Sequence, residues 1–240
     1  MVIACATGTG GAPRPGASVP HIEGFKALYD ARSVTPAKTH RFRLALALAP
    51  DRMRMEVLPP VGGPRLVVTA DGRRLMALDP QKRRAEIWNP EQDGVARLLG
   101  AAIAASDLRT LLEGRSPCGH AGEPAQDDRS CPFGGGRYRP GPAGDADTLR
   151  SATLLDAAGT PLLYLEYPPP GPAEGEWWRS IVLKRPAGAS TIRLTLVSGP
   201  TRADLDPALF STEPPERFES GEVLGDSGLS GTDVGEAQAP

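Results

Sequence analysis

The sequence predicts a mainly β protein, built as one domain on an antiparallel sheet with a large apolar face. In residues 41–48 and 53–57 every second side chain is apolar, which is the pattern of a strand with one buried face. Asp71-Gly72 stands between two short apolar runs, a strong hairpin signal. The chain of 240 residues also contains 28 glycines and 26 prolines, which favours many turns and disordered flanks.

Five strands are expected in the first part of the chain, joined by tight turns. They cover residues 41–48, 53–57, 66–69, 75–78 and 84–88. Residues 21–34 fit a strand but also show partial helical spacing. We interpret them as a strand that pairs with 41–48 across a turn at 35–39.

Two short amphipathic helices are expected after residue 88, at 93–104 and 107–113. Apolar residues recur in both at helical spacing, as in Val95, Leu98 and Leu99 of the first. Ser106 is a suitable N-cap for the second helix, and Gly114 is placed to end it. Their apolar sides must cover the sheet.

The second half of the chain is expected to continue the sheet after an interruption. Residues 115–147, rich in glycine, proline, arginine and aspartate, predict a long surface insertion. Strands are expected at 149–155, 162–167, 181–184 and 192–197, followed by a helical turn at 204–210 that packs under the sheet. The composition of 219–240 predicts a disordered tail, so the folded domain is assigned to 21–218.

The N-terminal residues Val2-Ile3-Ala4-Cys5 resemble the lipobox of bacterial lipoproteins. The resemblance implies cleavage before Cys5, acylation of its thiol, and a lipid-anchored envelope protein whose domain lies in the periplasm, at the outer membrane. Residues 1–20 would then be this start and a flexible tether. A signal peptide needs a basic and an apolar region before the cysteine, so a start upstream of Met1 stays open, as does the choice of membrane.

Two further cysteines, Cys118 and Cys131, bracket a polar segment. In an oxidising compartment we expect them to form a disulfide. One alternative is a zinc ion held by Cys118, His120 and Cys131, although structural zinc sites use four ligands. Two unrelated free thiols are the other alternative.

Several pieces occur in a recognisable order between residues 25 and 218. They are Arg52-Met53-Arg54-Met55-Glu56, Ala70-Asp71-Gly72, Leu111-Leu112-Glu113-Gly114, Trp178-Arg179-Ser180-Ile181-Val182-Leu183 and Pro214-Pro215. Their order and spacing resemble the LolA/LolB superfamily of periplasmic lipoprotein carriers and receptors. The resemblance implies a curved antiparallel sheet, an open half-barrel, with the two short helices plugging its concave face over a cavity for acyl chains. The receptors also carry a protruding loop with an apolar tip, for which the sequence offers no secure counterpart.

The residues themselves support an apolar cavity. Segments 66–68, 162–165 and 192–197 are apolar on both faces and need cover on both. A lipid tail can supply part of that cover, at about 0.8 kcal/mol for each buried CH₂. The alternative for every lining residue is ordinary core packing. The predicted lining is Phe42, Leu44, Leu46, Leu48, Met53, Met55, Val57, Leu98, Leu99, Leu108, Leu111 and Leu112.

Charge and motifs argue against other classes. A net charge of −2 without a basic stripe argues against nucleic-acid binding, and no apolar run reaches the roughly 18 residues of a membrane span. The histidines His21, His40 and His120 stand in unrelated segments, so we expect no catalytic residues, no metal and no cofactor.

The sequence therefore predicts a non-enzymatic envelope lipoprotein that binds acyl chains or the lipid moieties of lipoproteins. The alternative is a membrane-anchored structural or scaffold lipoprotein with a packed sheet, whose protein partners bind the insertion and the edge at Trp177-Trp178. An envelope hydrolase is a weaker third hypothesis.

Overall fold

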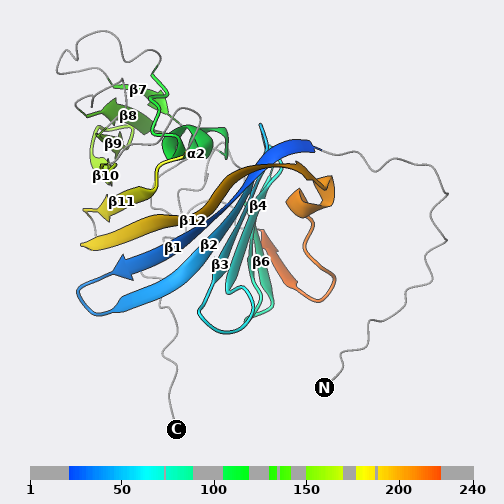
Figure 1. Cartoon of the computed structure of the whole chain (residues 1–240). Helices are drawn as coiled ribbons and strands as arrows, with labels where there is room; N and C mark the ends of the chain where they lie inside the picture. Colours follow the sequence, from blue (N-terminus) through cyan, green and yellow to red (C-terminus); the bar gives the residue numbers. More distant parts are fainter. Residues whose placement is uncertain are drawn as a thin grey trace.

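The computed structural model describes residues 22–72, 74–88, 105–118, 130–133, 136–141, 150–169, 177–186 and 189–222. They form one large sheet and two short helical elements (Figure 1). The elements are β1 (Ile22–Val34), β2 (Thr39–Leu48), β3 (Met53–Leu58), β4 (Leu66–Ala70), β5 (Leu75–Asp79), β6 (Arg84–Trp88), α2 (Ala105–Leu112), β7 (Cys131–Phe133), β8 (Gly136–Pro140), β9 (Ser151–Leu155), β10 (Pro161–Glu166), β11 (Ser180–Arg185), β12 (Ser190–Leu205), η2 (Pro207–Phe210) and β13 (Glu219–Glu222).

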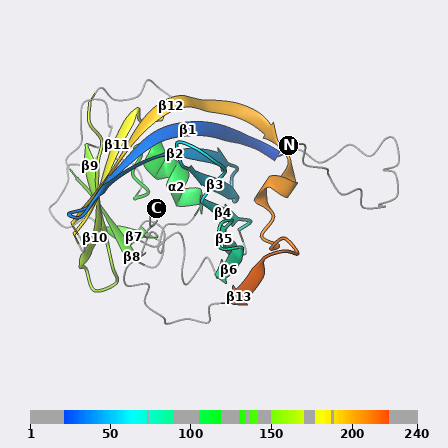
Figure 2. The same ribbon diagram turned by 90° about the horizontal axis from the view of Figure 1, so that it is seen from below.

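The sheet has thirteen strands in the order β13-β6-β5-β4-β3-β2-β1-β12-β11-β10-β9-β8-β7. Every neighbouring pair is antiparallel except β13 with β6, which is parallel. The sheet is curved and does not close, and α2 lies inside the curve (Figure 2). The predicted open half-barrel is confirmed.

The sheet consists of two meanders that meet where β1 pairs with β12. Ile22 lies opposite Leu205 at one end of this seam, and Val34 lies opposite Thr191 at the other. Residues 22–34 are therefore a strand, and it pairs with β2 as predicted, with Tyr29 opposite Leu44. Pairing on both sides explains why a segment of mixed periodicity settles as a strand.

The hairpin between β4 and β5 forms at Asp71-Gly72. Gly72 has a φ of 83°, which a glycine adopts without steric cost. The Arg74 N–H donates to Asp71 Oδ1 at 2.8 Å, and the Thr212 hydroxyl donates to Asp71 Oδ2 at 2.9 Å. The aspartate thus closes its own turn and also binds the chain that follows η2.

The second predicted helix is α2. Gly114, at a φ of 65°, follows the helix as predicted, whereas Ser106 lies inside the helix and not at its N-cap. The first predicted helix, 93–104, lies outside the described residues. The helical turn expected at 204–210 is the 3₁₀ element η2, in which the Ala208 N–H donates to Asp206 Oδ1 at 2.9 Å. Phe210 is buried on the convex side, beside Leu205.

Two regions differ from the sequence expectations. The described part of 115–147 is more than a surface insertion, because β7 and β8 extend the sheet and bury Phe133 and Tyr138. Residues 219–222, expected in a disordered tail, form β13 beside β6. This strand is polar and pairs through its backbone, so no apolar alternation announces it. β12 also continues past the expected 197 to Leu205.

The disulfide between Cys118 and Cys131 is present, with 5.5 Å between the two Cα atoms. It joins the chain that leaves α2 to the first residue of β7. The zinc alternative is thereby contradicted, because disulfide sulfurs are not thiolates; His120 itself lies outside the described residues.

Removing this disulfide is expected to lower the free energy of unfolding by about 3 kcal/mol, because the unfolded chain regains the entropy of an open loop. Urea unfolding of Cys118→Ser/Cys131→Ser beside the parent protein measures the difference. Equal midpoints for the two proteins would contradict the expectation.

Candidate functional site: an apolar cavity under the helix

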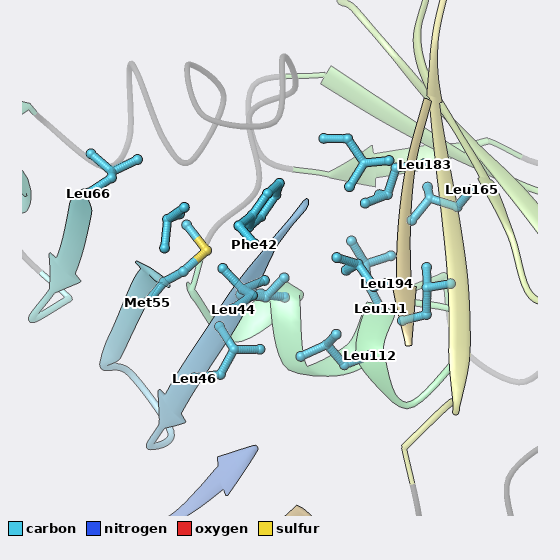
Figure 3. A pocket seen from close by; sticks show the side chains of 14 residues that line it. Phe42, Leu44, Leu46, Met55, Leu66, Leu111, Leu112, Leu165, Leu183 and Leu194 are labelled. Carbon is cyan, nitrogen blue, oxygen red and sulfur yellow. The ribbon is translucent and has the colours of Figure 1, made fainter. Parts of the chain in front are cut away.

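A cavity of about 130 Å³ lies between α2 and the concave face of the sheet. Its walls are side chains of β2, β3 and β4 on one side, β10, β11 and β12 on the other, and α2 (Figure 3). The lining is Phe42, Leu44, Leu46, Met55, Val57, Leu66, Leu108, Leu111, Leu112, Leu165, Ile181, Leu183, Ile192 and Leu194. Every one of these side chains is apolar.

Part of the lining expected for a ligand surrounds this cavity, on β2, β3 and α2. These residues are Phe42, Leu44, Leu46, Met55, Val57, Leu108, Leu111 and Leu112. Leu48 and Met53 are buried in the same core but do not line it. They lie opposite each other at the far end of the β2–β3 pair, and this end is core. Leu98 and Leu99 lie outside the described residues.

The second wall was not assigned to the cavity from the sequence. Leu165, Ile181, Leu183, Ile192 and Leu194 come from strands far away in the chain, and Leu66 begins β4. The available signal was that several of these segments are apolar on both faces. Which strands face α2 depends on the β1–β12 seam, and alternation within one strand does not reveal it.

The carboxyl end of α2 is fixed to the sheet side of the cavity. The last carbonyls of a helix lack partners within the helix. Here the Leu112 carbonyl accepts from the backbone N–H of Trp178 at 3.0 Å, and the Leu111 carbonyl accepts from the Tyr167 hydroxyl at 3.1 Å. Arg109 adds a cation–π contact, with its guanidinium 4.5 Å from the centre of the Phe25 ring.

Trp177 and Trp178 anchor this end of the helix and are not exposed. Their exposed fractions are 1% and 0%, and the Trp178 ring packs against Tyr167 at 5.3 Å between centroids. The expectation that partners bind at a Trp177-Trp178 edge is therefore wrong, because almost none of either side chain reaches the surface.

Three tyrosines lie buried around the same core. Burial raises the pKa of Tyr29, Tyr138 and Tyr167. At Tyr138 the electrostatic interaction with nearby Tyr167 raises the pKa further. Within the described residues, the hydroxyls of Tyr29 and Tyr138 and the indole N–H of Trp178 are buried without a hydrogen-bond partner. Ionisation of these phenols is therefore strongly unfavourable in the folded protein.

The loop between β3 and β4 projects an apolar side chain. Val61, in the loop Pro59–Pro64, has 87% of its surface exposed. This tip could not be predicted from the sequence, because the prolines and glycines of the loop are ordinary turn residues. No helix in the described parts of the chain has the length and apolarity needed to cross a bilayer. Those same parts hold no cluster of three potential metal ligands.

The fold can be compared with known structures. A LolA superfamily protein from Nitrosomonas europaea is similar at a TM-score of 0.51 and 14% identity, over 78% of this chain and 90% of that one. The chain has the LolA fold. A "putative outer membrane lipoprotein-sorting protein domain" from Vibrio parahaemolyticus is similar at a TM-score of 0.47 and 11% identity, over 79% of this chain and 89% of that one.

A DUF1329 family protein from Desulfovibrio piger is similar to this LolA-fold chain at a TM-score of 0.48 and 11% identity, over 74% of this chain and 85% of that one. No family profile and no curated protein matches the sequence. The resemblance inferred from the order of the sequence pieces is confirmed at the level of the fold.

Proposed function

We propose that the protein is a non-enzymatic envelope lipoprotein that binds acyl chains, either free or carried by lipoproteins, in the cavity under α2. The observation that carries the proposal is the cavity itself, whose fourteen lining side chains include no polar one. Such a space offers nothing to a polar ligand, and an acyl chain that enters it loses contact with water. A fully packed sheet, which the scaffold alternative requires, would leave no such space.

The volume of the cavity constrains the mechanism. An apolar cavity of about 150 Å³ holds a molecule as small as benzene. The 130 Å³ present here therefore admits only a short part of an acyl chain while α2 stays in place. We expect α2 to move away from the concave face when a long chain enters.

The energies are compatible with this movement. Burying ten methylenes contributes about 8 kcal/mol. The two hydrogen bonds that join the end of α2 to Trp178 and Tyr167 contribute about 1 kcal/mol each. The incoming chain also takes over contacts that Leu108, Leu111 and Leu112 make in the empty protein. Binding would thus be reversible and would need no covalent chemistry.

An envelope location is supported by two independent features besides the LolA fold. The Cys118–Cys131 disulfide fits an oxidising compartment. Cys5, at the end of a lipobox-like sequence, is the proposed site of lipid attachment. The exposed Val61 is the proposed counterpart of the apolar loop tip of the superfamily's receptors. Together the disulfide, Cys5 and Val61 support a role in lipid or lipoprotein trafficking at the outer membrane.

A pair of variants on β12 tests the cavity. Ile192 and Leu196 lie on the same face of the strand and are both partly buried, but only Ile192 lines the cavity. Ile192→Phe fills part of the space and is expected to weaken binding of a fluorescent fatty acid roughly tenfold or more, since each displaced methylene costs about 0.8 kcal/mol. Leu196→Phe is the control and should bind as the parent does.

Thermal unfolding of both variants checks that the added ring leaves them folded. The proposal fails when the parent protein takes up no fatty acid and co-purifies with no acyl lipid in native mass spectrometry. It also fails when both phenylalanine variants lose binding equally, because the loss is then unrelated to the cavity.

A further inference from the structure

A row of arginines crosses the convex face of the sheet. Arg193 of β12 lies opposite Arg32 of β1, and Arg32 lies opposite Arg41 of β2. Neighbouring strands are about 4.8 Å apart, so the three side chains leave the sheet side by side. Successive side chains of a strand point to opposite faces of the sheet. Phe42 follows Arg41 and Leu194 follows Arg193, and both line the cavity, so the arginines point to the other face. The three strands run together in Figure 1.

This arrangement has an electrostatic cost. Like charges directly opposite each other on neighbouring strands are destabilising. Within the described part of the chain, the one carboxylate in the adjoining row, Asp30, pairs with Arg43 at 3.4 Å, and no ion pair to Arg32, Arg41 or Arg193 is formed there. All three arginines are exposed. A local arrangement that opposes stability is a mark of a functional surface.

The arginines border a groove of about 650 Å³. The groove is also lined by Asp30, Ala31, Phe42, Arg43 and Thr195. Leu58, Pro59, Pro60 and Gly62, from the end of β3 and the loop that carries Val61, complete its lining. A guanidinium group has five N–H donors in a planar fork that matches the oxygens of a phosphate. The groove thus offers several such forks to an anionic group.

We propose that this groove docks on the phosphate headgroups of an anionic bilayer. A single soluble phosphate would be held weakly by exposed side chains, because water and salt screen each contact. A bilayer presents many phosphates together, and its negative surface potential attracts clustered basic residues. Because the loop that carries Val61 also lines the groove, the arginines and the apolar tip would contact the same membrane surface. The inference extends the proposed function by naming the partner surface, and it does not depend on acyl binding.

Vesicle flotation with the full chain tests the inference. Cys5→Ser is included in every protein so that no acyl anchor contributes to binding. Vesicles contain phosphatidylglycerol and phosphatidylcholine, or phosphatidylcholine alone. The test variant is Arg32→Gln/Arg193→Gln. The matched control is Arg137→Gln/Arg139→Gln, which removes two exposed arginines from β8, outside the groove.

The parent protein is expected to bind anionic vesicles, more strongly at low salt, and not to bind neutral vesicles. The Arg32/Arg193 variant should bind roughly tenfold or more weakly, while the β8 control binds as the parent does. The melting temperature of the Arg32/Arg193 variant should not fall, because relieving like-charge contacts does not destabilise a sheet. A fall would assign these arginines a structural role and overturn the inference.

Three other results would overturn it. The first is an equal loss of vesicle binding in both double variants, and the second is no vesicle binding by the parent. The third is stabilisation of the parent by inorganic phosphate without vesicle binding, which would make the groove a site for soluble phosphate. In all three cases fatty-acid uptake still reports on the cavity, so failure of this inference and failure of the proposed function are distinguishable.

Discussion

Gly114→Ala is expected to lower the free energy of unfolding by about 2–4 kcal/mol and to release α2 from the sheet. Gly114 has a φ of 65°, a conformation that costs a residue with a side chain about 1–2 kcal/mol. An added Cβ would also collide with Nε1 and Cδ1 of the Trp178 ring, which is fully buried. Neither partner has room to move, so the collision adds to the backbone cost.

Gly159→Ala is the matched control for this variant. Gly159 also has a positive φ, 86°, but nothing lies within 4 Å of a Cβ built there. It therefore measures the backbone cost alone, and the excess loss at Gly114 measures the contact with Trp178. Urea unfolding gives both values, and equal losses would show that the indole does not confine the end of α2. Because that end borders the cavity, Gly114→Ala should also accelerate fatty-acid uptake.

Stability is expected to fall steeply as the pH rises above about 10, the pKa of an unperturbed tyrosine. Burial raises the pKa of Tyr29, Tyr138 and Tyr167, so the folded protein keeps their protons where the unfolded chain releases them. The unfolded state then binds fewer protons than the native state, and the free energy of unfolding decreases with pH. Below pH 10 both states are protonated, and this contribution to stability is fully present.

Circular dichroism melting curves between neutral and alkaline pH measure this effect. Tyr29→Phe and Tyr138→Phe should each make the alkaline decline shallower, because one phenol no longer ionises on unfolding. At neutral pH neither change should cost much stability, since neither hydroxyl has a hydrogen-bond partner among the described residues. A stability that is constant across pH 10, or the same slope in parent and variants, would contradict the expectation.

Much of the fold could be predicted because the segments of β2 and β3 carry clear alternation and an Asp-Gly turn separates β4 from β5. The same alternation identified the cavity wall on β2 and β3. β7 and β8 were not predicted because only Phe133 and Tyr138 are buried there, among glycine, proline and arginine residues. β13 was not predicted because hydrogen bonds to β6, and not apolar side chains, hold it in place.

The other half of the site could not be predicted because it depends on which strands become neighbours. Period-two alternation shows that a strand has an inner face, but not what lies opposite that face. Ile192 and Leu194 meet α2 only because β12 pairs with β1. The arginine groove has the same origin, since Arg32 and Arg193 are far apart in the sequence. The resemblance to the LolA/LolB superfamily implied a cavity covered by helices but did not indicate its second wall.

The β1–β12 seam also governs the order in which the protein can form during synthesis. The two meanders consist of hairpins between consecutive strands and close over short distances in the chain. The seam between them joins Ile22 to Leu205, so it cannot form until nearly the whole domain has left the ribosome. Until then β1, thirteen residues long, has an unpaired edge that other chains can extend. The nascent protein is therefore most exposed to aggregation just before β12 appears, when a bound chaperone would protect it best.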